Sequence, residues 1–236
     1  MTALEGLPPG HPARVEALRA RLEEHPLAAQ LTARRKERMV QVAERRLRSV
    51  TVVMENLYDA HNVSAVVRTA EGFGLDAVHV VEQPHRYRRS PTIVRGADRW
   101  VHLHRHKEMQ ACAAALRREG FLVCAADVGA GARPIDEIPV DRPVAIVMGS
   151  EHEGLTRTAK VVADIRFWVP MCGFTESFNV SVSCSLALFD LARRRRQLQG
   201  CEGDLDYDTS ERTVLAWLEK SARRGTRNRL PAMLGV

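Results

Sequence analysis

Five polar residues in three separate segments are the side chains of this sequence best suited to chemistry. Asn62 and Arg68 stand six residues apart, Glu151 follows a glycine that ends an apolar run of strand length, and Ser177 and Asn179 precede a small-residue apolar stretch. Taken singly, each has an ordinary explanation: a surface arginine, a solvated carboxylate, and an asparagine that caps a helix. Arg68 could instead bind phosphate and stabilise developing negative charge, because a guanidinium stays charged and donates paired hydrogen bonds.

Taken in order, the three segments resemble the SPOUT superfamily of RNA methyltransferases and, within it, the TrmH tRNA ribose methyltransferases. The segments are Asn62–Ala70, Val144–Leu155 and Phe167–Asn179. The resemblance covers roughly residues 49 to 198. It implies that S-adenosylmethionine is the methyl donor and that the acceptor is a ribose 2′-hydroxyl in tRNA, most specifically that of guanosine 18 in the D-loop.

The resemblance also implies roles for individual residues. It places the methyl donor against Ala126, Met148, Gly149, Val169, Met171 and Phe178. Arg68 would act on the 2′-hydroxyl together with an RNA phosphate, Asn179 and Ser177 would orient the nucleotide or Arg68, and Glu151 would help to fix Arg68 and Asn62. Whether Arg68 is a general base or an electrostatic clamp stays open, and the chemistry of a guanidinium favours the clamp. Little more is needed, because the sulfonium already activates the methyl carbon.

The charge is concentrated at the two ends of the chain. Residues 1–50 hold ten Arg and Lys against six Glu, and residues 211–236 hold six against two. Since the whole chain is +6, the middle is near −2. Basic ends favour a polyanion such as RNA, although solvated helix faces are the alternative. The predicted RNA contacts are Arg38 and Arg46 in the basic N-terminal segment, together with Arg193 and Arg195, which the resemblance implies lie near the RNA-binding face. The loop arginines Arg86, Arg88 and Arg89 could serve the same purpose.

Alternation of strand-like and helical segments predicts an α/β fold with a parallel sheet covered by helices. Strands are expected at 49–54, 76–82, 121–126, 144–148 and 166–169, with helices at 62–72, 108–119 and 179–199. The expected organisation is a helical extension (1–48) split at Pro26, a methyltransferase domain (49–200), and a linker with a basic C-terminal helix (201–236). That last helix is expected to be capped by Asp208 and to end near Gly225. The resemblance adds a deep C-terminal trefoil knot, which the periodicity does not show.

The family pattern further implies a homodimer in which each active site draws on two subunits. The long helix after Asn179 would lie at the interface, through the face that contains Val180, Cys184, Ala187 and Leu188. The helical ends argue mildly against a small enzyme of the tRNA wobble position, and residues 1–48 are too short for the larger RNA-binding domain usual in ribosomal RNA methyltransferases. A catalytically silent RNA-binding homologue is a further alternative.

The sequence disfavours several other classes of protein: membrane, secreted, disulfide-rich, metal-binding and dinucleotide-binding proteins. No run of 18 apolar residues is present and the N-terminus lacks the layout of a signal peptide, so a cytoplasmic protein is expected. Five cysteines without Cys-x-x-Cys argue against a disulfide framework. His102, His104 and His106 would share one face of an extended segment, but no carboxylate or cysteine stands at a convincing partner spacing. We therefore expect no metal. The Gly-x-Gly-x-x-Gly loop of dinucleotide-binding proteins is absent after the first strand.

Overall fold

The structure, a computed structural model, describes residues 4–82, 89–150 and 153–233 and divides into two compact units. One unit is Arg48–Gly200. The other joins Met1–Leu47 to Cys201–Val236. The sequence treats the two ends as separate extensions, whereas in the structure they fold together. No helix in the described part of the chain has the length and apolar character needed to cross a membrane.

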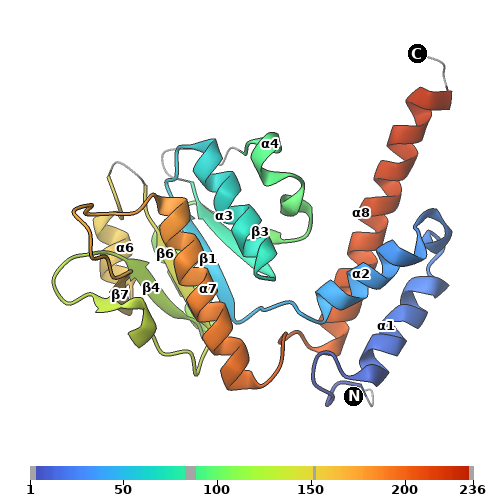
Figure 1. The fold of residues 1–236 in the computed structure, drawn as a ribbon, viewed down its shortest axis with the longest axis horizontal. Coiled ribbons are helices and arrows are strands. Elements are labelled where there is room, and N and C mark those ends of the chain that lie inside the picture. Colours follow the sequence, from blue (N-terminus) through green and yellow to red (C-terminus); the bar gives the residue numbers. More distant parts are fainter. Residues whose placement is uncertain (1–3, 83–88, 151–152, 234–236) are drawn as a thin grey trace. The chain divides into compact units, whose positions relative to one another are not determined.

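The Arg48–Gly200 unit is built on a seven-stranded sheet (Figure 1). Its strand order is β3-β2-β1-β6-β4-β7-β5, and every neighbouring pair runs parallel. The strands are β1 (Val50–Glu55), β2 (Ala77–Val81), β3 (His102–His106), β4 (Leu122–Ala126), β5 (Arg133–Pro134), β6 (Val144–Met148) and β7 (Ile165–Trp168). The predicted parallel α/β sheet is thus confirmed.

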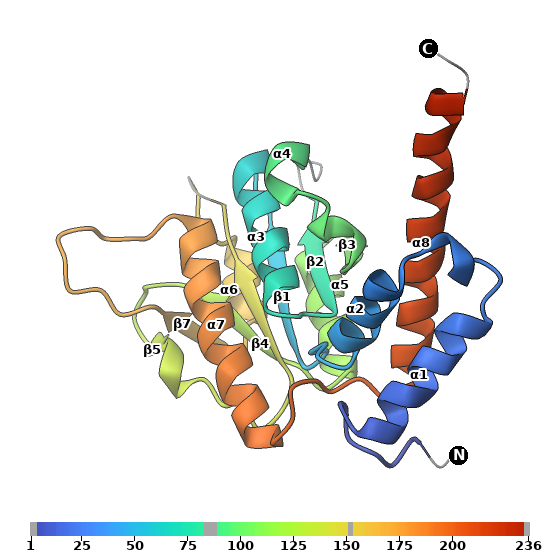
Figure 2. The ribbon, with the colours of Figure 1, turned by 45° about the vertical axis from the view of Figure 1, so that its right-hand side comes forward.

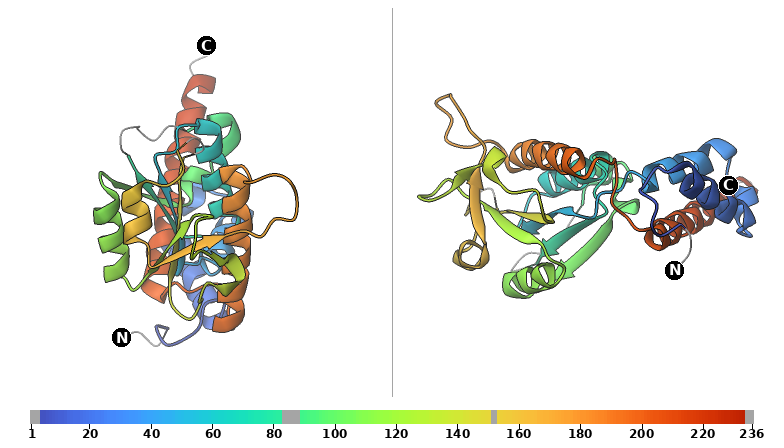
Figure 3. Two further views of the ribbon diagram at one scale, coloured as in Figure 1. Left: turned by 90° about the vertical axis from the view of Figure 1, so that its left-hand side faces the viewer. Right: turned by 90° about the horizontal axis from the view of Figure 1, so that it is seen from below.

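Helices cover both faces of this sheet, as Figure 3 shows in its right-hand view. Helices α3 (Ala60–Gly72) and α7 (Val180–Gln199) lie side by side on one face, next to the short α4 (Pro91–Val94). Helices α5 (Met109–Arg118) and α6 (Arg157–Val162) pack on the other. Two-sided covering explains why β6 is a continuous apolar run and β1 is mostly apolar, and why both are buried throughout.

The order in which successive strands are added to the sheet reverses beside β1. Strands β1, β2 and β3 follow one another toward one edge, whereas β4 lies on the other side of β6, which is inserted next to β1. In open parallel sheets, ligands bind beyond the carboxyl ends of the strands at such a reversal. A ligand site is therefore expected beyond the carboxyl ends of β4, β6 and β7. The trefoil knot implied by the resemblance stays a prediction.

The described part of the second unit contains three α-helices, which enclose their own core, and a short 3-10 helix at Ala28–Gln30. The three α-helices are α1 (Pro12–Glu24), α2 (Ala33–Ala43) and α8 (Tyr207–Met233), and α1 ends just before Pro26, as predicted. Apolar side chains from all three helices are buried, among them Leu18, Val40 and Trp217. Helix α8 continues through Gly225, so its predicted end was wrong.

The predicted cap of α8 was also wrong. The carboxylate of Asp206 accepts hydrogen bonds from the Thr209 backbone N and hydroxyl, each at 2.7 Å, so the cap lies two residues earlier than Asp208. A cap residue is identified by its geometry at the first turn, and several acidic residues near a helix start satisfy the sequence pattern equally well.

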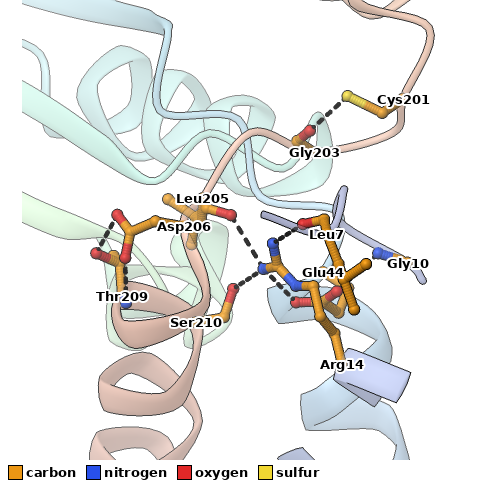
Figure 4. A network of polar contacts seen from close by, with 10 residues as sticks. All are labelled: Leu7, Gly10, Arg14, Glu44, Cys201, Gly203, Leu205, Asp206, Thr209 and Ser210. Carbon is orange, nitrogen blue, oxygen red and sulfur yellow. Dashed lines mark hydrogen bonds and ion pairs between the residues drawn. The ribbon is translucent and has the colours of Figure 1, made fainter. Parts of the chain in front are cut away.

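A buried ion pair ties the three helices together (Figure 4). Arg14 on α1 contacts the Glu44 carboxylate at 3.0 Å, and both side chains are almost fully buried. The same guanidinium donates to the carbonyl oxygens of Leu7 and Leu205 and to the hydroxyl of Ser210. These acceptors satisfy both terminal nitrogens of Arg14, whereas its buried Nε has no hydrogen-bond partner among the described residues.

Candidate active site

A cavity of about 470 Å³ opens at the carboxyl ends of β4, β6 and β7. This volume lies within the usual range for small-molecule sites, about 300–1,000 Å³. All six residues predicted to hold the methyl donor line it: Ala126, Met148, Gly149, Val169, Met171 and Phe178. They come from three strand ends and from the loop between β7 and α7, which extends away from the sheet in Figure 2. The lining also includes Ser177 and Asn179.

One wall of the cavity is a tight loop that begins at Gly149. Ser150 and Gly154 exchange two backbone hydrogen bonds, Ser150 N to Gly154 O at 3.1 Å and Gly154 N to Ser150 O at 2.9 Å. A Cβ added at Gly149 would come within 2.4 Å of the Gly154 carbonyl carbon, so only glycine allows this approach. Gly173, expected for the same reason, has no such constraint, because a Cβ there would meet nothing within 4 Å.

The same loop is anchored at its far end by Glu55, a residue that the sequence analysis missed. This buried carboxylate, at the end of β1, accepts hydrogen bonds from the Thr156 backbone N at 3.0 Å and from its hydroxyl at 2.7 Å. Thr156 in turn caps α6. The available signal was an acidic residue directly after the strand-like run 49–54, since a carboxylate that is buried with the strand end needs a partner.

Asp127 contributes the acidic side chain of the described cavity lining. Its two carboxylate oxygens contact Lys160 at 3.1 Å and Arg166 at 3.3 Å, and Lys160 also lines the cavity. The carboxylate follows β4 directly, so it stands at the mouth formed by neighbouring strand ends. It therefore offers an acceptor for ligand hydroxyl groups while the two cations balance its charge.

Asn179 joins the rim of the cavity to helix α3. Its side-chain oxygen caps α7 by accepting from the Ser181 backbone N at 2.8 Å, and its amide nitrogen donates to the Asn62 side-chain oxygen at 3.1 Å. A second hydrogen bond joins the two helices, between the hydroxyl groups of Thr69 on α3 and Ser185 on α7, whose oxygens are 3.2 Å apart. Asn179 therefore combines the structural role of a cap with a position at the cavity rim, and it holds Asn62 near that rim.

Arg68 lies apart from this pair within a single chain. It follows Asn62 by six residues on α3, which corresponds to about 9 Å along the axis and about 240° around it. Its side chain is exposed and donates to the Ile93 carbonyl oxygen of α4 at 3.5 Å. The chain thus brings together Asn62, Asn179 and Ser177, but not Arg68. Glu151, predicted for the same site, lies outside the described residues.

Most of the arginines at the end of α7 fasten this helix to its own unit. Arg194 donates to the carbonyl oxygens of Ile135 and Ile138, and Arg196 to that of Phe73. Arg195, a predicted RNA contact, is half-buried and donates to Ser49 and Val140. The structure therefore gives Arg195 a structural role, and we do not retain it as an RNA contact.

Arg193 is the member of this run that is exposed, and it is only weakly tied, to Asp190 and Gln197 at 3.5 Å each. Of the two predicted contacts in the helical unit, Arg38 is exposed on α2. Arg46 is fully buried, with its guanidinium 5.0 Å from the ring centroid of Trp217. Arg46 therefore cannot reach RNA in this conformation, because aromatic stacking and burial hold it inside the unit. Arg86 and Arg88 lie outside the described residues.

The charge distribution differs between sequence segments and folded units. The helical unit holds 15 Arg and Lys against 12 Asp and Glu, and Arg48–Gly200 holds 20 against 17, so each is +3. The acidic residues between positions 202 and 208 fold with the basic C-terminal segment and offset it. The expectation of basic arms on a near-neutral body therefore describes sequence segments and not the folded units, which carry equal net charge.

Comparison with known proteins places the sheet unit in a known class. A model of the SpoU rRNA Methylase family matches residues 49–189. The chain is 36% identical over 163 residues to the tRNA (guanosine(18)-2'-O)-methyltransferase of Escherichia coli (strain K12), which is 69% of this chain and 71% of that protein. It is 31% identical over 191 residues to the protein of the same name from Thermus thermophilus, covering 80% and 98% of the two chains.

Solved structures share the fold. The A. aeolicus TrmH/SpoU tRNA modifying enzyme has a TM-score of 0.73 with 24% identity, and the match covers 80% of this chain and 96% of that one. An AdoMet-bound rRNA methyltransferase from Sinorhizobium meliloti has a TM-score of 0.55 with 24% identity, over 61% and 56% of the two chains. At these identities the two structures establish the fold alone.

Proposed function

Because the chain belongs to the SpoU rRNA methylase family, we propose that it transfers a methyl group from S-adenosylmethionine to the 2′-hydroxyl of guanosine 18 in tRNA. The main structural support is the cavity at the ends of β4, β6 and β7, which is lined by all six residues expected to hold the donor. The relatives from E. coli and T. thermophilus carry the guanosine 18 activity in their names. We assign the activity to the cytoplasm.

The donor supplies an activated methyl carbon, so the protein's contribution is alignment and charge stabilisation. The 2′-oxygen attacks that carbon, the carbon–sulfur bond breaks, and the hydroxyl proton leaves to a base or to water. The glycine loop at 149–154 and the apolar lining would hold the donor with its methyl group toward the rim. Asn62 and Asn179 stand at that rim and can hydrogen-bond a nucleotide. Arg68 would clamp an RNA phosphate and stabilise the developing alkoxide.

This mechanism needs Arg68 beside Asn179, and we propose that a second copy of the chain supplies it. Helix α7 presents an exposed apolar stripe formed by Val182, Leu186 and Phe189, at intervals of four and three residues. These side chains are 41–54% exposed, which is unusual for large apolar groups grouped on one helix face. The face expected at the interface, with Cys184, Ala187 and Leu188, is instead buried against the chain's own sheet.

Oligomeric state tests the dimer directly. We expect Leu186→Glu to convert a dimer into a monomer in sedimentation experiments at micromolar concentration, because a buried unpaired carboxylate is costly. Leu198→Glu is the matched control. Leu198 is 58% exposed on the same helix but lies about 120–180° around it from the stripe, so its replacement should leave the dimer intact. A wild-type chain that is monomeric and fully active would refute the shared site.

Complementation tests whether the two residues meet across the interface. Arg68→Ala and Asn179→Ala chains should each be inactive alone, and mixed dimers should recover part of the activity because one of the two sites is intact. Donor binding by Arg68→Ala should stay within a few-fold of wild type, since its expected contacts are to RNA. If the mixture stays inactive although mixed dimers form, Arg68 and Asn179 belong to the same subunit's site.

The substrate is tested with an unmodified tRNA transcript and labelled S-adenosylmethionine, followed by mapping of the 2′-O-methyl group. A matched transcript with 2′-deoxyguanosine at position 18 should accept no methyl group. Methylation at another tRNA position, or of ribosomal RNA in preference to tRNA, would refute the substrate but not the reaction. Absence of methyl transfer to total RNA by a donor-binding protein would refute the reaction and favour an RNA-binding homologue.

We propose Arg38 and Arg193 as RNA phosphate contacts, since both are exposed. Replacing each by alanine should weaken tRNA binding and lower the log–log salt slope by about 0.7–0.9 per lost contact. Arg118 is the matched control. It is an exposed arginine on α5, on the opposite face of the sheet from α7, and its replacement should leave the slope unchanged. Equal slopes for all three variants would remove these contacts from the proposal.

A further inference from the structure

A cluster of histidines lies outside the cavity, on the face of the sheet that α5 covers. In the parallel register of β2 and β3, His79 is paired with His104, and Val81 with His106. All four side chains therefore point to the same face. The His79 ring stacks on His104 with centroids 4.8 Å apart and on His106 at 5.3 Å. The three-histidine pattern noted in the sequence thus gains a fourth, buried imidazole.

The fold also brings a thiol to this cluster. Cys112, in the first turn of α5, is fully buried, and its sulfur lies with one nitrogen of His79 and one of His106 so that all three atoms are within 4.8 Å of one another. The Nδ1 of His79 and the Nε2 of His106 are 3.0 Å apart. No spacing in the sequence indicates this convergence, because the residues come from two strands and a helix. None of the three lines the methyl-donor cavity.

We propose that His79, His106 and Cys112 form a binding site for a zinc-like divalent cation. Imidazole nitrogen and thiolate sulfur are the ligand types that Zn²⁺ prefers, and three protein ligands with a fourth position left to water or to His104 make a common tetrahedral arrangement. Tetrahedral bonds of about 2.05 Å to nitrogen and 2.3 Å to sulfur require N–N and N–S separations of about 3.3 and 3.6 Å. The atoms would therefore have to move by little more than about 1 Å.

Burial favours the uncharged form of two of these groups. Burial lowers the pKa of His79 to about 3, and the neighbouring His104 and His106 add to the shift. Burial raises the pKa of the Cys112 thiol to about 12, and the nearby Glu55 carboxylate adds to it. Binding must therefore release the thiol proton to solvent, which a coordinated divalent ion achieves outright. The same carboxylate favours a positive charge at this place.

The site would fasten an edge strand. Strand β3 pairs with β2 alone, and most of its residues are half-exposed or exposed. An ion held by His106 of β3, His79 of β2 and Cys112 of α5 would add a bond from α5 to the two strands, which are already joined by backbone pairing and by the contact between the two imidazoles. Binding to the folded state stabilises it by mass action, so the melting temperature should rise with added metal. His104 and the half-exposed His106 leave a path from solvent.

Metal titration of the full chain, first stripped with a chelator, tests the proposal. We expect one equivalent of Zn²⁺ per chain to bind and to raise the melting temperature, and one equivalent of Co²⁺ to produce the sulfur-to-cobalt charge-transfer absorption of a thiolate ligand. The Cys112→Ser variant should lose this absorption. Cys124→Ser is the matched control, because Cys124 is also fully buried but stands on β4 outside the cluster. Absence of the band in wild type, or its persistence in Cys112→Ser, would overturn the proposal.

A second pair of variants separates a built site from a histidine-rich surface. His106→Ala removes a half-exposed ligand with little risk to folding and should weaken Zn²⁺ binding at least about tenfold, the lower end of what even an outer ligand partner costs. His102→Ala removes an exposed imidazole of the same strand and face, which contacts Asp76 at 3.7 Å instead, and should leave the affinity unchanged. Equal losses in both variants would overturn the proposal. Donor binding should be unchanged in every variant, which keeps this test independent of methyl transfer.

Discussion

Replacing Gly149 by alanine should weaken binding of the methyl donor. The added Cβ would lie 2.4 Å from the Gly154 carbonyl carbon and 2.5 Å from the Leu155 nitrogen, against about 3.4 Å for an ordinary contact. Both neighbours are backbone atoms, so no side chain can rotate away. The loop must therefore shift by about 1 Å, and the two hydrogen bonds between Ser150 and Gly154 cannot both survive.

The size of the effect follows from these two losses. Each hydrogen bond contributes about 1 kcal/mol net, and forcing extra volume into a packed site costs about 1–3 kcal/mol. A total of about 2–4 kcal/mol, if it falls on the donor-binding conformation of the loop, corresponds to a loss of affinity of roughly 30- to 700-fold. Calorimetric titration with S-adenosylmethionine and with S-adenosylhomocysteine measures it without any dependence on RNA.

Gly173→Ala provides the matched control for this experiment. Gly173 was expected to allow the same kind of close approach, but a Cβ there would meet nothing within 4 Å and the residue does not have a positive φ. Its replacement should leave donor affinity within about twofold. Equal affinity for Gly149→Ala and wild type would refute the reasoning, since the loop would then not need the contact. Equal losses in both variants would show that the close approach at Gly149 is not what donor binding depends on.

Three further outcomes are expected. Glu55→Gln should lower the free energy of unfolding of the sheet unit by about 1.5–3 kcal/mol, the value of hydrogen bonds to a charged group, and should weaken donor binding; unchanged values in denaturant titration and calorimetry would exclude the anchor. Arg14→Ala should destabilise the chain by about 3–5 kcal/mol because it leaves Glu44 buried without its partner, whereas the double variant Arg14→Met, Glu44→Leu should cost less; if the double variant is the less stable one, burial of the pair is favourable in itself. Asn179→Ser should keep the melting temperature, because serine is a good cap, and should lose methyl transfer because the bond to Asn62 is gone; a fully active Asn179→Ser enzyme would reduce Asn179 to a cap.

Five of the seven strands, the long helices, the family and the six residues expected to hold the donor could be predicted from the sequence, whereas β3, β5, α4 and α6 were not assigned. An apolar run such as Val144–Met148 indicates a strand that is buried on both faces. The family motifs at Asn62, Gly149 and Asn179 are short runs of neighbouring residues, so the sequence alone reveals them. Element ends were less certain. Helix α8 passes through Gly225 because one glycine costs a helix only about 1 kcal/mol relative to alanine and does not by itself end it.

Only the tertiary structure decided which charged side chains are buried and which groups they contact. Nothing local distinguishes Arg46, which is stacked inside the helical unit, from the exposed Arg38, or Arg195 from Arg193. A charged side chain becomes structural when distant segments close around it, and those segments are not its sequence neighbours.

The same physical reason applies to charge and to ligand clusters. The acidic residues at 202–208 offset the basic helix that follows because they fold into the same unit. His79 and Cys112 lie 33 positions apart, and only the pairing of β2 with β3 and the packing of α5 on both bring them together. Sequence patterns record periods of a few residues, whereas convergence of side chains depends on which elements become neighbours in the folded sheet.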